Sequence, residues 1–246
     1  METHLASWMK STPDGDLAES ILRRCVHCGF CTATCPTYQL LGDELDGPRG
    51  RIYLIKQVLE GETASRATQT HLDRCLTCRN CETTCPSGVA YGQLLDVGRK
   101  VVEQQVSRPL SQRLLRGLLR ETLTRSWLFN PAMKLGQSLR SILPPFLRAK
   151  VPVKRAAGLL PTPLQLAEHR RQVFMLVGCV QPAMMPSIDA ATIRVLHRLG
   201  IRAETSQGSG CCGAIRHHLS DESGALAQAR RNIDAWWPSS NDRRCC

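Results

Sequence analysis

The chain has 246 residues, of which 42% are hydrophobic and 22% are charged, with a formal net charge of +11 and 13 cysteines. These values argue against an intrinsically disordered chain and allow one large or two modest globular domains. The longest stretch without charge, residues 172–188, is interrupted by Pro182 and Pro186, which excludes it as a membrane-spanning helix.

The first twenty residues contain acidic side chains and no continuous apolar run. They resemble neither a secretory signal nor an Arg-rich transit peptide, so we expect a reducing, cytoplasmic location. Disulfides are rare in such a compartment, and the number of cysteines is odd. Metal ligands are therefore favoured over disulfide bonds.

An internal repeat dominates the first hundred residues. The pattern CxxCxxCxxxCP occurs at residues 25–36 and again at residues 75–86. In two-cluster ferredoxins, the first three cysteines of such a run hold one 4Fe-4S cluster, and the fourth, redirected by the proline, holds the cluster of the other run. The spacing therefore predicts one cluster on Cys25, Cys28, Cys31 and Cys85, and a second on Cys35, Cys75, Cys78 and Cys81.

A pair of structural zinc sites is the alternative, because CxxC pairs also suit tetrahedral zinc. Zinc would leave the third evenly spaced cysteine and the Cys-Pro step without a role, so iron is favoured. Four cationic or titratable residues lie near the motifs and could tune the cluster potentials, although solvated loop and helix-surface positions are the favoured interpretation. They are His27, Arg49, Arg51 and Arg79.

The segment between the two motifs indicates the fold of this domain. From Pro48 to Gly61 the apolar residues recur at helical intervals, and a second short helix is expected over residues 67–76. Strand signals are lacking. We therefore predict a mainly α-helical two-cluster ferredoxin domain over residues 15–100.

Residues 101–171 are predicted to form a basic helical linker segment. Fifteen Lys and Arg residues face only three acidic ones in residues 99–171. A membrane-surface helix, a docking site for partner subunits and a solvated helical face all remain open, whereas nucleic acid is not expected because a recognisable binding motif is missing. Prolines between residues 143 and 166 indicate a linker. One helical face would carry Leu110, Leu114, Leu115 and Leu118, and the other Arg113, Arg116 and Arg120.

Residues 172–237 have the pattern of an α/β domain. A buried strand is expected over residues 173–180, a helix over 189–199, a second, parallel strand over 201–206 and a further helical stretch that ends near Trp237. Ligands of parallel sheets gather beyond the carboxyl ends of the strands. A redox or metal site is favoured there over simple packing, formed by Cys179, Cys211 and Cys212, with His217 and His218 expected at the surface. Residues 238–246 are expected to be a polar, aberrant tail in which Cys245 and Cys246 are incidental.

These motifs carry a family resemblance. The segments CVHCGFCTATCPTYQLLGDELDGPRGRIYLIKQVLEG, HLDRCLTCRNCETTCPSGV and GCCGA, in this order, resemble the iron–sulfur subunit of bacterial glycolate oxidase, also called glycolate dehydrogenase. More loosely, they resemble the iron–sulfur subunits of lactate-utilisation complexes, anaerobic glycerol-3-phosphate dehydrogenase and heterodisulfide reductase. The resemblance implies that the eight motif cysteines bind two 4Fe-4S clusters. It also implies partner subunits that carry FAD and oxidise glycolate to glyoxylate.

On this basis we expect a non-catalytic electron-transfer subunit that passes electrons from the flavin towards an acceptor such as quinone. Contact with the inner face of the cell membrane would use the basic segment. A subunit that serves lactate or glycerol phosphate, a CCG-type thiol or disulfide reductase and a redox-sensing protein are the alternatives. The family carries two CCG domains and this chain only the first half-site, so we expect a truncated or frame-shifted product.

Overall fold

The computed structural model describes residues 1–161, 169 and 171–241, and the side chains of residues 238–241 are left out of the description. The chain divides into two compact units, residues 1–109 and residues 110–246. Cys245 and Cys246 lie outside the described residues. Each unit is taken below by itself.

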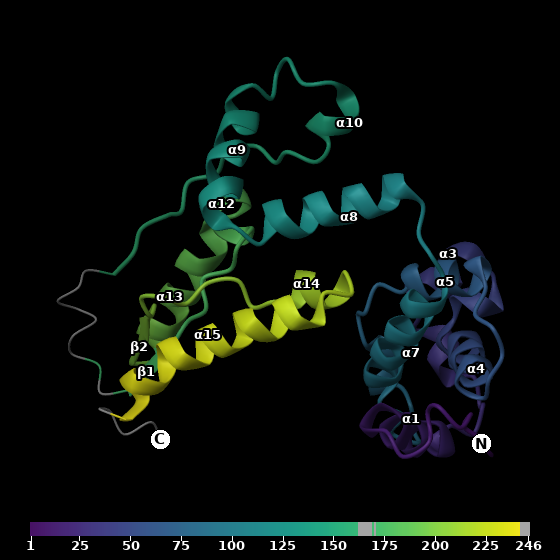
Figure 1. The fold of residues 1–246 in the computed structure, drawn as a ribbon. Helices are drawn as coiled ribbons and strands as arrows, with labels where there is room; N and C mark the ends of the chain where they lie inside the picture. Colours follow the sequence, from purple (N-terminus) through teal and green to yellow (C-terminus); the bar gives the residue numbers. More distant parts are fainter. Residues whose placement is uncertain (162–168, 170, 242–246) are drawn as a thin grey trace. The chain divides into compact units, whose positions relative to one another are not determined.

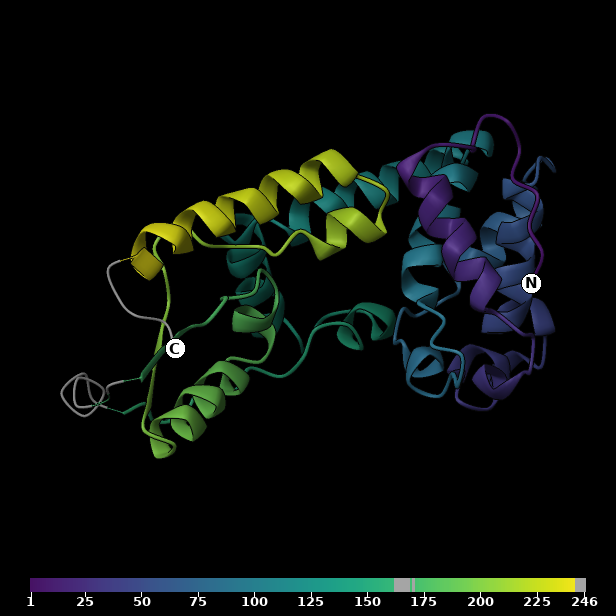
Figure 2. The same ribbon diagram turned by 90° about the horizontal axis from the view of Figure 1, so that it is seen from below.

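The first unit is built from helices around a hydrophobic core (Figure 1). Helix α7 packs against α1, α4 and α5, and Figure 2 shows α1 from a second direction. No strand occurs within residues 1–109, so the prediction of a mainly helical cluster domain is confirmed. The elements are α1 (Pro13–Arg24), α2 (Phe30–Ala33), α3 (Pro36–Leu41), the 3-10 helix η1 (Glu44–Asp46), α4 (Pro48–Leu59), α5 (Arg66–Asp73), α6 (Asn80–Thr83) and α7 (Tyr91–Gln105).

Local sequence accounts for where these helices begin. The Thr12 side chain caps α1 by accepting a hydrogen bond from the Gly15 backbone N–H at 3.0 Å. Pro48 occupies the first turn of α4, where its missing N–H is not needed. Gly98 lets α7 approach α4 closely, because a Cβ at this position would lie 2.6 Å from the Ile55 side chain.

The boundary of the first unit lies beyond the predicted residue 100, which falls inside α7. Val101 and Val102 are buried in the core, so the helix continues to Gln105. Arg108 then ties the end of the unit to Asp73 of α5 and Glu103 of α7, with ion pairs of 2.6 Å to each carboxylate.

The second unit contains helices and one short parallel pair of strands (Figure 1). Strands β1 and β2 pair in parallel, with Arg171 opposite Ile201, and α13 packs against β2. The predicted strand–helix–strand arrangement is therefore confirmed. The elements are α8 (Leu110–Leu123), α9 (Ser126–Ser138), α10 (Pro145–Arg148), β1 (Arg171–Phe174), α12 (Gln181–Met184), α13 (Ser187–Arg198), β2 (Ile201–Glu204), α14 (Ala214–His218) and α15 (Glu222–Asn241).

Three details of the second unit differ from the predictions. β1 ends at Phe174 instead of continuing to residue 180, and its side chains are exposed or half-buried because it has β2 as its only described neighbour. The proline-rich linker contains the short helix α10, which starts at a proline. The last helix does not end at Trp237, since α15 continues to Asn241.

Candidate metal centre

The two cysteine motifs have matching backbone conformations. His27 and Gly29 in the first motif, and Thr77 and Arg79 at the corresponding places of the second, all have φ values between 52° and 83°. A left-handed conformation costs a residue other than glycine roughly 1–2 kcal/mol. Its repetition in both motifs turns each loop tightly enough to bring the first three cysteines together before α2 and α6 begin.

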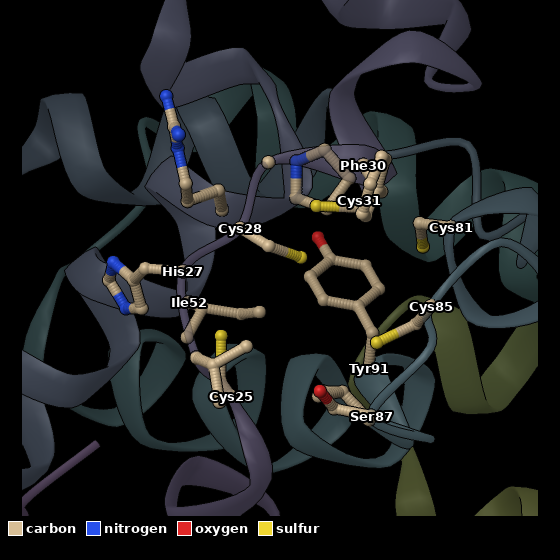
Figure 3. A pocket seen from close by; sticks show the side chains of 15 residues that line it. Cys25, His27, Cys28, Phe30, Cys31, Ile52, Cys81, Cys85, Ser87 and Tyr91 are labelled. Atoms are coloured by element: carbon tan, nitrogen blue, oxygen red, sulfur yellow. The ribbon is translucent and has the colours of Figure 1, made fainter.

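Two cavities lie between these loops. The first cavity is lined by the first three cysteines of motif one together with Cys81 and Cys85 of motif two. Figure 3 shows these five cysteines around the side chain of Tyr91. The second cavity is lined by the first three cysteines of motif two and by Cys35 of motif one. The fourth cysteine of each motif therefore faces the cavity of the other motif, and Cys81 lines both cavities.

The thiol chemistry of the cavities suits a multinuclear metal site. Burial, followed by the charges of neighbouring Cys75 and Cys31, raises the pKa of Cys81 to about 12. Burial and then Cys25 likewise raise the pKa of Cys31. Several thiolates this close together repel one another, so their joint ionisation needs a cation to compensate the charge. Four cysteines line the second cavity, which is the number of thiolates that a 4Fe-4S cluster requires, and four remain at the first cavity once Cys81, which lines both, is assigned to the second.

A buried polar network lies beside the second cavity. Arg51 is only 1% exposed, and its guanidinium donates hydrogen bonds to the His71 carbonyl at 2.7 Å and to the Thr37 hydroxyl at 3.1 Å. The same guanidinium lies 3.3 Å from the fully buried Asp46 carboxylate. Arg74 also donates to Asp46, at 2.8 Å. Hydrogen bonds from His71 and Arg74 outweigh the effect of burial and lower the pKa of Asp46.

The four residues considered for tuning thus differ in their surroundings. The expectation that Arg51 is a solvated surface residue is wrong, because it falls on the same side of α4 as the buried Ile55 and Val58. Arg49 is more than a third exposed and pairs with Glu44 at 2.6 Å. Burial and then the charge of Arg49 lower the pKa of His27. Arg79 lines the second cavity.

Sequence reasoning overlooked three residues of this region, Thr37, Asp46 and Tyr91. The Tyr91 hydroxyl donates to the Cys75 sulfur at 3.6 Å, and the Thr37 hydroxyl lies 3.2 Å from the Cys35 sulfur. The place of Thr37 two residues after a motif cysteine was a usable signal. No comparable signal marked Asp46 or Tyr91, which reach the cysteines only through the packing of helices.

The second unit brings the three cysteines predicted there close to one another, with different exposure. Cys179 and Cys211 are buried, whereas Cys212 is exposed. Burial, followed by the hydrogen bond and charge of Cys211, raises the pKa of Cys179 to about 12. Asn232 of α15 holds the loop, since it accepts from the Gly210 N–H at 2.8 Å and donates to the Cys211 carbonyl at 3.0 Å. His217 and His218 are exposed, as expected.

These features define an iron–sulfur protein. Residues 21–89 match the family described as 4Fe-4S dicluster domain, and residues 173–245 match the family described as Cysteine-rich domain. The chain therefore combines a segment similar to 4Fe-4S dicluster domains with one similar to cysteine-rich domains, and the predicted order of the two domain types is confirmed.

The similarity to individual proteins is more specific. The chain is 57% identical to the glycolate oxidase iron-sulfur subunit of Escherichia coli (strain K12) over 97% of its own length and 58% of that protein. It is 30% identical to the probable glycolate oxidase iron-sulfur subunit of Bacillus subtilis (strain 168), over 89% of the chain and 54% of that protein. The predicted family resemblance is thus confirmed, and the chain spans somewhat more than half the length of these relatives. No solved structure matches the chain.

Proposed function

We propose that this chain is the electron-transfer iron–sulfur subunit of a complex that oxidises glycolate to glyoxylate. The observation that carries the proposal is the pair of thiol-lined cavities inside one helical core, in a chain that is 57% identical to a glycolate oxidase iron-sulfur subunit. The clusters would supply one-electron redox chemistry. The chain itself contributes the thiolates, the buried charges and a surface for its partners.

Flavin chemistry would belong to partner subunits that carry FAD. The test is to purify the chain without oxygen, with the subunits that copurify with it, and to add glycolate. We expect the visible iron–sulfur absorbance of this chain to bleach with glycolate and to remain with lactate or glycerol 3-phosphate. Bleaching by lactate or glycerol 3-phosphate alone would instead support one of the related dehydrogenases.

We propose crossed ligation for the clusters. Cys25, Cys28 and Cys31 would share the first cluster with Cys85, and the second would be held by Cys35, Cys75, Cys78 and Cys81. The cavity linings support this assignment, because the fourth cysteine of each motif lies at the cavity of the other motif. A proline follows the fourth cysteine of each motif, as in two-cluster ferredoxins whose fourth cysteine binds the other cluster, and this pattern favours the same arrangement.

Paired substitutions distinguish crossed from uncrossed ligation. Cys28→Ser with Cys85→Ser removes two ligands of one crossed site, so the variant should retain about four iron atoms per chain instead of about eight. Cys28→Ser with Cys35→Ser damages both crossed sites and should lose nearly all iron. The measurement is iron content together with EPR spectra after dithionite reduction. The reverse order of iron contents would contradict crossed ligation.

We also propose a second thiol site at Cys179, Cys211 and Cys212. The proximity of Cys179 and Cys211 and the hold of Asn232 on their loop support it. If Cys211→Ser leaves glycolate-dependent electron transfer intact in the complex, this site has a structural role only.

A peripheral contact with the cytoplasmic face of the cell membrane completes the proposal. No helix in the described part of the chain is long and apolar enough to cross a bilayer. Helix α8 instead presents exposed leucines beside arginines, which is the pattern of a helix that lies on an anionic membrane surface. This contact would bring the chain near a membrane-bound acceptor such as quinone.

A further inference from the structure

The cysteine sulfurs of the two cavities differ in their hydrogen-bond contacts with side chains. In the described residues, side-chain hydroxyls lie within hydrogen-bond distance of the sulfurs of Cys35 and Cys75, both at the second cavity. No side chain of the described residues donates to the sulfurs of the crossed first set, Cys25, Cys28, Cys31 and Cys85.

Of the two hydroxyls, that of Tyr91 is the one with a defined direction, because it donates to its sulfur. It begins α7, is buried, and lines both cavities, but its hydroxyl is directed to Cys75. The geometry alone makes the phenol a donor to this sulfur.

Thr37 acts at the other end of the second cavity. Its hydroxyl accepts a hydrogen bond from Arg51 at 3.1 Å and donates to the Asp46 carbonyl at 2.8 Å, while the Cys35 sulfur lies 3.2 Å away. Donation from the cationic Arg51 polarises this hydroxyl, which strengthens it as a donor. The hydroxyl has a single proton, and a thiolate at Cys35 is a stronger acceptor for it than the Asp46 carbonyl.

Fixed charges do not distinguish the two sites in this way. At the second cavity the buried Arg51 and Asp46 compensate each other, and Arg74, whose side chain is 48% exposed, is screened by water. At the first cavity Arg49 pairs with Glu44, and both are exposed enough to be screened as well. The difference between the sites therefore lies in the side-chain hydroxyls.

We propose that the second site, formed by Cys35, Cys75, Cys78 and Cys81, has the higher reduction potential of the two, and that Tyr91, Thr37 and Arg51 set this order. Reduction adds one negative charge to a cluster, and hydrogen bonds to its sulfurs favour the reduced form. An electron shared between the sites resides mainly at the second. The inference rests on the proposed function, because it requires both clusters.

The experiment is an anaerobic EPR-monitored redox titration of the full chain. Tyr91→Phe and Thr37→Val each remove one hydroxyl. Each is expected to favour the oxidised form of the higher-potential centre about tenfold, which lowers its midpoint potential by about 59 mV for one electron. The lower-potential centre should keep its midpoint. Tyr53→Phe is the matched control, because this half-exposed residue of α4 removes the same atom without contact to a motif sulfur, and neither midpoint should move.

Variants that retain only one of the two sites show to which site each shift of midpoint potential belongs. Tyr91→Phe should lower the remaining midpoint in the Cys28→Ser/Cys85→Ser background and leave it unchanged in the Cys35→Ser/Cys78→Ser background. If these backgrounds fail to fold, the intact chain still decides the matter, because both hydroxyl variants must move the same, higher-potential centre. A shift of the lower-potential centre, or no shift, overturns the inference while the proposed function stands. A chain without iron overturns the proposed function itself.

Discussion

At the scale of single residues, Asp46 connects three elements of the first unit. It belongs to η1 and is bonded by Arg51 of α4 and by His71 and Arg74 at the end of α5. The Asp46 carboxylate is fully buried, so it stabilises the fold only while these partners compensate its charge. The position of α5, and with it the start of the second motif, therefore depends on one carboxylate.

Asp46→Asn tests this dependence. The lowered pKa of Asp46 means that its ionised form stabilises the fold above the unfolded pKa of about 3.9, and that this contribution is lost as the pH falls through the lower folded pKa. At pH 7 the variant leaves Arg51 buried without its counter-charge, which should reduce the free energy of unfolding by about 3–5 kcal/mol. Anaerobic denaturant unfolding measures the change.

The matched control is Asp14→Asn. Asp14 pairs with Lys100 at 2.9 Å, and both side chains are more than 40% exposed. An exposed pair of this kind contributes about 0–1 kcal/mol. Equal losses of unfolding free energy in the two variants would show that the buried ion pairs of Asp46 stabilise the fold no more than an exposed pair does.

At the scale of elements, α8 differs from every long helix of the first unit. None of its residues is buried, and its leucines from Leu110 to Leu119 are exposed. Arg120 on this helix is already engaged with Glu121 and Asp221. The cationic face is therefore smaller than the count of arginines indicates, and the exposed leucines must contribute much of any membrane binding.

Substitution of two leucines tests the membrane contact. Leu114 and Leu118 are 74% and 61% exposed, so Leu114→Gln with Leu118→Gln should leave the fold intact. We expect binding to anionic phosphatidylglycerol vesicles in a flotation assay to weaken at least tenfold, because about 1.5–3 kcal/mol of transfer free energy is lost for each leucine. Leu40→Gln, at an 83% exposed site in the first unit, should bind as the parent does. Unchanged binding by the double variant would remove α8 from the proposal.

Sequence patterns predicted some of these elements and missed others for physical reasons. The cysteine spacing and the helical period of residues 48–59 are local, so they identified the motif loops and α4. The inward direction of Arg51 follows the same helical period, but its charge favoured a surface position. Its burial is possible because the Asp46 carboxylate compensates that charge. Residues 175–180 have the composition of a buried strand, yet a strand needs neighbours, which the described chain provides only over four residues.

At the scale of the whole molecule, the two units have unequal cores. The main cluster of buried apolar residues runs from Leu5 to Val102, entirely within the first unit. In the described part of the second unit, the buried apolar residues are Phe129, Cys179, Ala190, Cys211 and Ala225. Both cavities and all eight motif cysteines also lie in the first unit, so we expect this unit to fold and to bind metal by itself.

Two fragments test the independence of the first unit. Residues 1–109 are expected to hold about eight iron atoms per chain after anaerobic expression. Residues 1–100 lack Val101 and Val102 and also Gln105, whose side chain accepts a hydrogen bond from the Ala64 N–H at 3.0 Å. This shorter fragment should bind less iron and unfold at a lower temperature. Equal iron content and equal unfolding temperatures would show that the end of α7 is dispensable.

The second cysteine of each motif affects how the protein withstands oxygen. Cys28 and Cys78 are the exposed members of their groups, and the apolar side chains of Val26, Phe30 and Leu76 are exposed beside them. Oxidants reach thiolates in proportion to their exposure, so damage by air should begin at these two sulfurs and progress to sulfenic acid and loss of iron. A partner that covers the apolar side chains would also shield the sulfurs, and the tolerance of the protein to oxygen would then depend on its state of assembly.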